Sequence, residues 1–443
     1  MNGQNGNNNG NIQAPVSPKK FLFVGWESLS GDIAWQIKKE GHEVKIYVKA
    51  ECDQDVYDGF LEKVADYKQF IDWADVVVFD DVGFGKEADE LRKKGKLVIG
   101  GSEYTDKLEE NREFGQAEMK KMGMLTLPHW DFTDHELALK FIEENPGRYV
   151  YKPSGIMGSD SKGILFLGKD EDGKDIHEMI RSNKITLEKR VKQFQLQKFA
   201  QGVEVAVGAF FNGKDFIYPV NVNFEHKKLF PGDIGPFTGE MGTLMYWSGP
   251  NTIFRTTLEK MREKIKESGY IGYIDINCIA NARGIYPLEF TCRFGYPHIS
   301  IATEGIISPL GNFLYSLAKG ETFELKTKKG FQIGICCVVP PFPYYDKNEM
   351  GIYKDLSIIF KKPNLDGIHL GDVKKSPEGN WQIAGESGYV LVVTSSGTTV
   401  EDARKLVYSK IENILLQNMF YRTDIGLGWY ADSDKLQTWG YLY

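Results

Sequence analysis

Lys152 begins the stretch of sequence that is best suited to phosphate chemistry. It ends the apolar run RYVYK, and Gly155, Gly158 and the pair Lys162 and Gly163 follow it. A lysine that leaves a strand into a loop with glycine and serine can place its ammonium on phosphate oxygens while loop amides bind the rest. The stretch therefore predicts a phosphate-binding loop, although an ordinary polar hairpin has the same composition.

A second group of polar residues stands where a later strand ends. Glu289 closes the run IYPLEF, and Thr291 and Arg293 follow it at alternate positions. A carboxylate can lie beside phosphate oxygens when a Mg²⁺ ion lies between them. In the preceding run YIDINCIA, Asp275 and Asn277 share one strand face by period-two alternation. In the alternative interpretation, Glu289 is only a surface acid at a strand end and Asp275 is only a turn residue.

The elements that must position these residues alternate along the chain. From Phe21, short apolar runs alternate with amphipathic stretches, which indicates βαβ units on a parallel sheet and an α/β fold at the N-terminus. Thr133 and Glu136 predict a capping box before the helix ELALKFIEE, and residues 401–416 predict another amphipathic helix. No internal repeat is visible. We divide the chain into a disordered tail (1–18), an N-terminal α/β domain (19–122), a small α+β unit (123–192), a large α+β unit (193–325) and a β-rich C-terminal domain (326–443).

Composition excludes several classes of protein. The 443 residues carry a net charge of −7, which argues against a protein that binds nucleic acid regardless of sequence. No apolar run is long enough to span a bilayer, and we expect no membrane segment and no export signal. The five cysteines are odd in number and lack CxxC spacing, which predicts reduced thiols and a cytoplasmic protein.

Several collinear motifs resemble the phosphoribosylamine–glycine ligase family of the ATP-grasp superfamily. GDIGPFTGEMG (232–242) is similar to the family's GPNTGGMG, FEHKK (224–228) to QDHKR, TCRFGYPH (291–298) to NCRFGDPE, and YRTDIG (421–426) to YRKDIG. The likeness covers almost the whole chain after the tail. It implies an ATP-grasp fold of two α+β subdomains, the small one a lid, and an ATP-dependent ligase of purine biosynthesis that joins a carboxylate to an amine through an acyl phosphate.

The resemblance assigns roles residue by residue. It implies ATP with Mg²⁺ or Mn²⁺, held between two β-layers, and small-molecule acid and amine substrates for a monomer or homodimer. His226, a residue type that is as often structural, matches the family's substrate side. The implied nucleotide contacts are Arg112, Lys152, Gly155, Gly158, Lys162, Gly163, Gln197, Lys198, Phe199 and Glu204; the implied metal ligands are Glu289, Asp275 and Thr291; and the implied catalytic residues are Arg293, Lys162, His226 and Lys227.

The departures from the family gather where it holds its substrates. GGREHA, which helps to form the phosphoribosylamine pocket, is replaced by residues 25–32, so its arginine and histidine are gone. Both acids of GDPE are lost at residues 295–298, Glu240 replaces a glycine, and Tyr389 replaces the arginine of GGRVL. Such exchanges of polar groups alter substrate choice. The sequence therefore predicts amide-forming ligation, by a phosphoribosylamine–glycine ligase or by a paralogue for another amino acid or amine. An ATP-grasp kinase and a nucleotide-binding regulator are the further alternatives.

Overall fold

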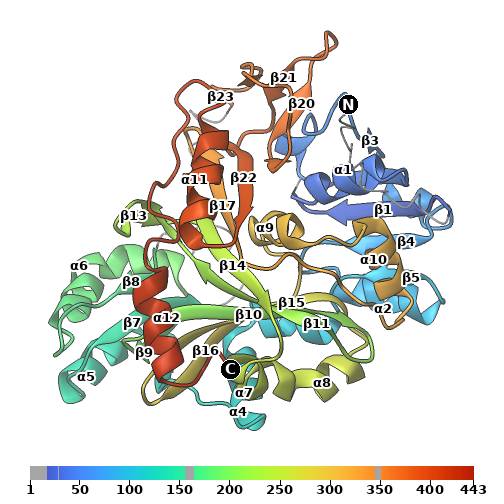
Figure 1. The fold of residues 1–443 in the computed structure, drawn as a ribbon. Helices are drawn as coiled ribbons and strands as arrows, with labels where there is room; N and C mark the ends of the chain where they lie inside the picture. The colour runs from blue at the N-terminus through green and yellow to red at the C-terminus, as the bar shows by residue number, and fades with distance from the viewer. Residues whose placement is uncertain (1–16, 28, 155–163, 345–350) are drawn as a thin grey trace, which may run out of the picture.

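The computed structural model describes residues 17–443 except residue 28, residues 155–163 and residues 345–350. Its first unit, blue in Figure 1, is a parallel sheet in the order β3-β2-β1-β4-β5. The predicted βαβ units are confirmed. The strands are β1 (Lys20–Gly25), β2 (Glu43–Val48), β3 (Glu62–Lys63), β4 (Val76–Phe79) and β5 (Leu97–Ile99), with helices α1 (Gly31–Lys39) and α2 (Gly85–Lys93).

The strand order of this sheet reverses between β1 and β4. Open parallel sheets bind ligands at such a switch point, outside the carboxyl ends of the strands. Here β1 ends at Gly25 and β4 is followed by Asp80. This edge faces the rest of the chain.

Two short helices connect this unit to the next. These are α3 (Glu103–Glu110) and α4 (Arg112–Lys121). The Ser102 side chain accepts a hydrogen bond from the N–H of Thr105, and Asn111 caps α4 by accepting from Phe114. Because Asn111 both ends α3 and caps α4, Arg112 stands in the first turn of a new helix, where the helix dipole favours anions.

The small unit, green at the lower left of Figure 1, is an antiparallel sheet in the order β6-β9-β7-β8. Its elements are β6 (His129–Phe132), β7 (Tyr149–Ser154), β8 (Phe166–Leu167), β9 (Gln193–Lys198), α5 (His135–Glu144) and α6 (Lys174–Arg190). The predicted capping box at Thr133 is wrong. Asp134 is the N-cap, because its extended backbone lets one carboxylate oxygen accept from the N–H groups of both Glu136 and Leu137.

An eight-stranded sheet forms the centre of the molecule, in the order β16-β15-β10-β11-β14-β17-β22-β19. Its strands are β10 (Val203–Asn212), β11 (Phe216–Glu225), β14 (Gly242–Ser248), β15 (Ile271–Asn281), β16 (Gly284–Thr291), β17 (Phe331–Val338), β19 (Ile368–Leu370) and β22 (Tyr389–Gly397). The C-terminal strands β17, β22 and β19 thus extend the sheet of the large unit, while β18 pairs with β23 and β20 with β21. Where one domain ends and the next begins stays a prediction.

Helices and short strands cover this sheet. The helices are α7 (Thr252–Thr256), α8 (Arg262–Glu267), α9 (His298–Gly305), α10 (Leu310–Ala318), α11 (Val400–Ile411) and α12 (Trp429–Thr438). The short strands are β12 (Lys228–Phe230), β13 (Ile234–Phe237), β18 (Ile359–Phe360), β20 (Val373–Lys375), β21 (Trp381–Ile383) and β23 (Ile414–Leu415). The helix predicted over 401–416 is shorter than expected, because Ile414 and Leu415 pair with β18.

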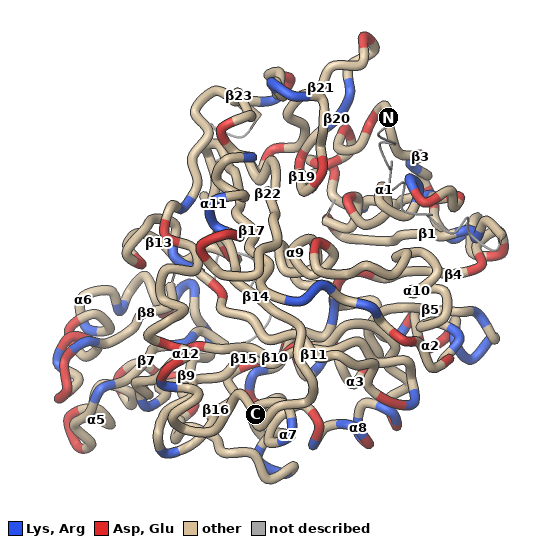
Figure 2. Tube along the Cα trace, in the orientation of Figure 1, with Lys and Arg blue, Asp and Glu red and all other residues tan. Residues whose placement is uncertain are grey.

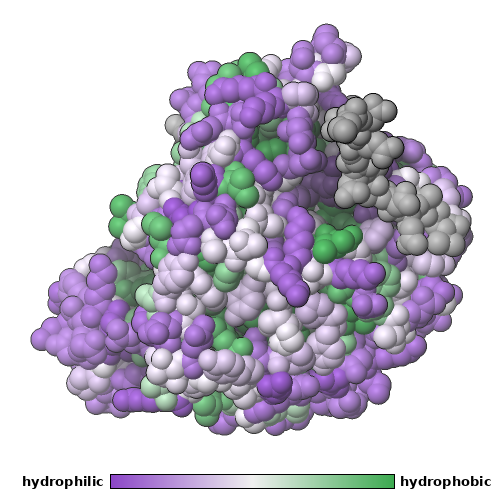
Figure 3. Space-filling view, in the orientation of Figure 1, coloured by the Kyte–Doolittle hydropathy of each residue, from purple (hydrophilic) through white to green (hydrophobic). Residues whose placement is uncertain are grey.

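The surface is mixed in charge and hydropathy. In Figure 2 basic and acidic residues alternate along the outer helices α5, α6 and α8. Figure 3 shows apolar residues scattered among hydrophilic ones on the visible face. Across the described residues, no helix is both long and apolar enough to cross a membrane.

Candidate active site

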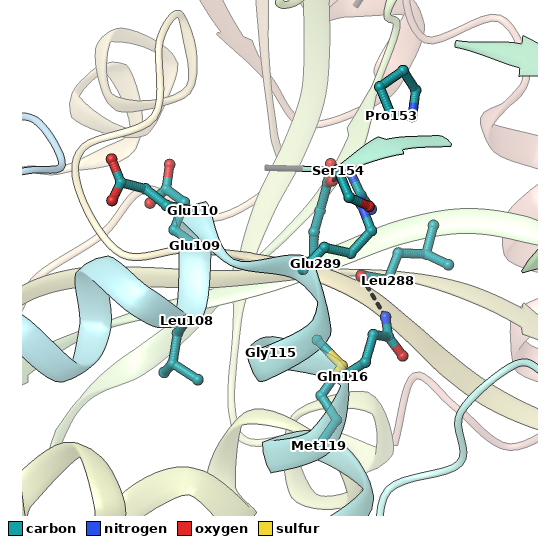
Figure 4. Close-up of a pocket in the computed structure, with 11 residues that line it drawn as sticks. Leu108, Glu109, Glu110, Gly115, Gln116, Met119, Pro153, Ser154, Leu288 and Glu289 are labelled. Atoms are coloured by element: carbon teal, nitrogen blue, oxygen red, sulfur yellow. Dashed lines mark hydrogen bonds and ion pairs between the residues drawn. The ribbon is translucent and has the colours of Figure 1, made fainter. Parts of the chain in front are cut away.

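A pocket of about 180 Å³ opens where α3 and α4 meet β7 and β16. In Figure 4, Glu289 and Ser154 lie close together in the pocket, Glu109 and Glu110 project from the end of α3, and Gln116 bonds the carbonyl of Leu288. We call the pocket and the charged residues beside it, Arg112, Lys152, Lys227 and Glu289, the central cleft.

Strand register brings the predicted acids to this cleft. β15 and β16 are antiparallel, with Asp275 opposite Thr291 and Asn277 opposite Glu289. Side chains of directly opposed residues project from the same face of a sheet. Thr291 and Glu289 therefore lie on the same face of the sheet as Asp275 and Asn277.

Lys227 lies at the centre of three carboxylates. Its Nζ is 3.2 Å from Glu204 Oε1, 3.2 Å from Glu225 Oε2 and 3.6 Å from Glu289 Oε1. Burial lowers the pKa of Lys227, but the three acids outweigh burial and hold this pKa well above its usual value. Asn277 donates to Glu204 (3.1 Å) and to Glu225 (3.2 Å), which fixes both acids. This group of side chains is a preformed site for positive charge.

Glu225 is a member of the site that sequence reasoning missed. It ends β11, two positions before Lys227, and Asn223 lies two positions before it. The alternation Asn223, Glu225, Lys227 along one strand face was the available signal.

Lys152 and Arg112 bring two further cations to the cleft. Lys152 lies on β7 opposite Gln195 of β9 and is only 9% exposed. Burial, and then the neighbouring Arg112, lowers the pKa of Lys152 to about 7. Arg112 Nη2 is 3.8 Å from Glu289 Oε2. An anion that entered here would meet two cations and the first turn of α4.

Asp275 lies on β15, and Arg293 follows β16, the strand that carries Glu289. Arg293 Nε is 3.0 Å from Glu109 Oε1 and 3.7 Å from Asp81 Oδ1, so this arginine joins the central sheet to the N-terminal unit. Asp275 accepts from Asn223 (3.0 Å), and burial, followed by repulsion from Glu225, raises the pKa of Asp275 to about 7. Within the described residues, no three His, Cys, Asp or Glu side chains are grouped to hold a metal ion by themselves.

The side chain of His226 lies outside the cluster of acids that surrounds its neighbour Lys227. Burial, and then the positive charge of Arg422, lowers the pKa of His226, whose other charged neighbours are Asp424 and Asp233. Its backbone is bonded to Gly242 and Met241. The His226 side chain thus lies near the buried Arg422, whose Nη1 donates to the Lys228 carbonyl and to Asp233.

Of the implied nucleotide contacts Gln197, Lys198 and Phe199, the last two already use their backbone N–H groups in internal hydrogen bonds. The N–H of Lys198 donates to the carbonyl of Pro128, and that of Phe199 donates to Arg148. Gln197 Nε2 is buried and has no hydrogen-bond partner among the described residues. The side-chain amide of Gln197 is thus the group among these three residues that a ligand could satisfy. Gly155, Gly158, Lys162 and Gly163 lie outside the described residues.

Comparison with known proteins agrees with this geometry. Residues 110–299 match the family of phosphoribosylglycinamide synthetase ATP-grasp (A) domains. The phosphoribosylamine–glycine ligase of Streptococcus pneumoniae is 26% identical, over 92% of this chain and 99% of that protein.

Two solved structures show the fold. The crystal structure of phosphoribosylamine–glycine ligase from Thermotoga maritima has a TM-score of 0.68 at 22% identity, covering 92% of this chain and all of that one (100%). The biotin carboxylase domain of the Hydrogenobacter thermophilus 2-oxoglutarate carboxylase, solved with MgADP, has a TM-score of 0.62 at 13% identity, covering 96% of each chain. The ATP-grasp fold and the resemblance to phosphoribosylamine–glycine ligases are confirmed.

Proposed function

We propose that this protein is an ATP-dependent ligase that joins a carboxylate to an amine, on the plan of phosphoribosylamine–glycine ligase. The observation that carries the proposal is the central cleft, in which Lys152, Arg112 and Lys227 converge on Glu289 from three parts of the chain. Three cations around a small pocket suit the phosphates of ATP better than any uncharged ligand.

The reaction divides into two displacements. A substrate carboxylate oxygen attacks the γ-phosphorus of ATP, the bond to the β-phosphate oxygen breaks, and ADP leaves with that electron pair. The amine nitrogen then attacks the acyl carbon, phosphate leaves with the electrons of the C–O bond, and the nitrogen loses a proton. Both steps need alignment and charge stabilisation, and neither needs a nucleophile from the protein.

The side chains of the central cleft supply these two requirements. Lys152 and Arg112 would hold the phosphate chain, and Lys227, fixed by Glu204 and Glu225, would stay charged throughout. Arg293, anchored by Glu109, would stabilise charge on the transferred phosphoryl group. Gln197 would read the adenine edge, and Lys162 and Gly163, which lie outside the described residues, are proposed to cover the phosphates.

A divalent cation fits the cleft as a partner of phosphate. Mg²⁺ is usually held by one or two carboxylates together with substrate phosphate oxygens. Glu289 would be the first ligand, with Asp275 and Thr291, which face each other across β15 and β16, as candidates for the second. Mg²⁺ or Mn²⁺ bound there would neutralise charge on the β- and γ-phosphates.

Release of ADP tests the proposal directly. The full-length protein is incubated with ATP, Mg²⁺ and a panel of amino acids, with phosphoribosylamine and with other amines, and ADP is measured. A ligase releases ADP only when both an acid and an amine are present. ADP release that needs no amine would identify a kinase, and no release with any pair would contradict the proposal. Lys152→Met is the matched inactive variant and Lys140→Met, an exposed lysine of the same unit, is the control.

The proposed setting is the cytoplasm. All five cysteines are free thiols in the structure, and four of them are buried, which suits a reducing compartment. The partners that we propose are the small-molecule acid and amine, bound by a monomer or a homodimer.

A further inference from the structure

Glu109 holds the chain where it leaves β16. Its Oε1 accepts a hydrogen bond from Nε of Arg293 (3.0 Å), and its Oε2 accepts one from the backbone N–H of Cys292 (2.7 Å). Hydrogen bonds to an ionised group are short and strong, and the Glu109 side chain is only 14% exposed, so water competes weakly for them. One carboxylate therefore fixes both the main chain after the strand and the side chain that follows.

The guanidinium of Arg293 is held at two of its three nitrogens. Nε donates to Glu109, and Nη1 donates to the carbonyl of Phe294 (3.3 Å). Asp81 adds a longer ion pair, with its Oδ1 3.7 Å from Nε. Within the part of the chain that the structure describes, Nη2 donates no hydrogen bond, and the Arg293 side chain is 26% exposed. These bonds fix the plane of the guanidinium and leave one amino group to meet a ligand.

Glu109 also makes the largest favourable electrostatic contribution at Arg293. Burial lowers the pKa of Arg293, but Glu109 and then Asp81 outweigh burial and raise this pKa above its usual value. Arginine stays protonated in proteins even without such partners. The charge of Arg293 therefore does not depend on Glu109, whereas the orientation of the guanidinium does.

The same carboxylate lies next to the nucleotide side of the central cleft. Glu109 is the penultimate residue of α3, and Arg112 begins α4 three residues later, with Asn111 as the C-cap of the first helix and the N-cap of the second. Arg112 Nη2 lies 3.8 Å from Glu289 Oε2. Figure 4 shows Glu109 projecting from the end of α3 beside the pocket. The corner between α3 and α4 thus sets where both arginines stand relative to Glu289.

Direct contact with a ligand is the alternative role for Glu109, because this residue lines the pocket. Both of its carboxylate oxygens already accept hydrogen bonds from the chain. A cation bound to Glu109 would also lie beside the positive charge of Arg293, which would repel it. The geometry therefore favours a role that Glu109 exerts through Arg293.

We propose that Glu109 is a positioning residue for phosphoryl transfer, which holds the guanidinium of Arg293 in the orientation that stabilises charge on the transferred phosphoryl group. The proposal rests on the proposed ligase function, in which Arg293 has that role, and it adds a residue that contacts no substrate itself. Orientation matters because a displacement of about 1 Å can slow a reaction between positioned groups about 100-fold.

A mimic of the transferred phosphoryl group tests this role without turnover. The full-length protein is titrated by calorimetry with Mg²⁺ and ADP, and again with aluminium fluoride added, an anion that takes the place of the γ-phosphoryl group. Glu109→Gln keeps the shape of the side chain, but an amide has one oxygen for the two donors and turns its NH₂ group toward the other. We expect the Kd for ADP with aluminium fluoride to rise about 30-fold and the Kd for ADP alone to stay within about twofold.

A double variant shows whether Glu109 acts through Arg293. Arg293→Lys keeps the positive charge but loses the planar fork that Glu109 holds. In this background Glu109→Gln should raise the Kd for ADP with aluminium fluoride by less than about threefold, because the group that it positions is gone. Glu113→Gln, an exposed acid on α4, is the matched control and should bind as the wild type does. Losses that multiply in the double variant would overturn the proposal.

Other results of the same titrations would also overturn it. These are an undiminished affinity for ADP with aluminium fluoride in a folded Glu109→Gln variant, an equal loss of affinity for ADP alone, and a wild type that binds the two ligands equally tightly. If Glu109→Gln does not fold, Glu109→Asp takes its place in the cycle with the same expected coupling, since it keeps the buried charge but is too short to reach both donors.

The titrations separate this inference from the proposed ligase function, because they need neither a substrate pair nor product release. A protein that releases no ADP with any acid and amine, but shows the coupling between Glu109 and Arg293, would contradict the ligase and leave the positioning role standing. A protein that releases ADP only with an acid and an amine, yet loses affinity for ADP itself when Glu109 is changed, would confirm ligation and refute the positioning role.

Discussion

The central cleft adjoins a second region, the switch-point cleft, which is formed by Asp80, Tyr296, Asp372 and Tyr389, and burial affects charged groups differently in the two. In the central cleft, acids and cations are balanced, with Lys227 within 3.6 Å of three carboxylates and Arg112 beside Glu289. In the switch-point cleft, Asp80 and Asp372 are buried, and burial is the main cause that raises the pKa of each, to about 7 for Asp80. Burial therefore dominates at Asp80, whereas charged partners dominate at Lys227.

This difference follows the pattern of departures from the family. Residues of the central cleft match the family motifs, as Lys152, Glu289 and Arg293 do. The switch-point cleft lies where GGREHA, GDPE and GGRVL have changed. We infer that the phosphoryl-transfer step is kept and that the chemistry of the amine is what differs, and four predictions test that division.

The largest effect is expected from removal of the charge of Glu289. Glu289→Gln keeps the shape of the side chain but weakens its hold on a cation during phosphoryl transfer. We expect kcat to fall about 100-fold or more, which corresponds to roughly 2.7 kcal/mol of transition-state stabilisation, with a much smaller change in the Kd of ATP. Steady-state ADP release and an ATP titration measure the two. Glu188→Gln, on the exposed surface of α6, is the control. A near-normal kcat would remove Glu289 from the site.

The burial of Asp80 should affect how the stability of the protein depends on pH. The pKa of Asp80 is about 7 in the folded protein and about 3.9 in an unfolded chain, so the folded state binds more protons between these values. Stability should therefore decrease as pH rises from about 4 to about 7. Asp80→Asn removes the contribution of Asp80 to this dependence, and should raise the free energy of unfolding relative to wild type by on the order of 2 kcal/mol at pH 8.5 but little at pH 4.5. Urea unfolding at the two pH values measures it, and Asp75→Asn, just before the opposite end of β4, should run parallel to wild type.

Lys152, in the central cleft, should make stability depend on pH in the opposite direction. Lys152 has a pKa of about 7 when folded and about 10.4 when unfolded, so the unfolded state binds more protons between these values and stability should increase with pH there. Phosphates bound beside Lys152 would restore its proton. Binding of ATP at pH 8.5 should then take up about one proton, measured by calorimetry in two buffers of different ionisation enthalpy. Lys152→Met should abolish the uptake and Lys140→Met should not; an unchanged uptake in the first variant would place the proton elsewhere.

The two clefts also differ in how far the sequence could predict them. Local alternation was enough to place Asp275 and Asn277 on one face, and the short antiparallel connection between β15 and β16 brought Glu289 and Thr291 beside them. Glu225 was missed, although its strand carries the same alternation. The parallel sheet and the strands of the central sheet were predictable because each strand is a short apolar run with its own turn signals.

The switch-point cleft could not be predicted because its contacts are long in sequence. Asp32 and His369 are hydrogen-bonded across 337 positions, and Tyr296 bonds Asp80 across 216. No periodicity relates such residues, since their meeting depends on how β22 and β19 extend the central sheet toward α1. The shared sheet was itself not foreseen, because the strand pattern of residues 326–443 fits a separate domain equally well.

The smallest effect, and the sharpest test of the metal site within the central cleft, concerns Asp275 and Thr291. These residues are opposed across β15 and β16, where the family has asparagine in place of Thr291. If Asp275 supplies the ligand that a threonine hydroxyl cannot, Thr291→Asn should preserve activity and reduce the loss in kcat caused by Asp275→Asn. A double-mutant cycle on kcat should then give a coupling energy of about 1 kcal/mol, as expected for neighbours that share a ligand. Thr291→Val, which offers no oxygen, should leave the dependence on Asp275 as strong as in the wild type. Additive effects of Asp275→Asn and Thr291→Asn would show that Asp275 only supports the fold, and that Glu289 holds the cation with phosphate oxygens and without help from β15.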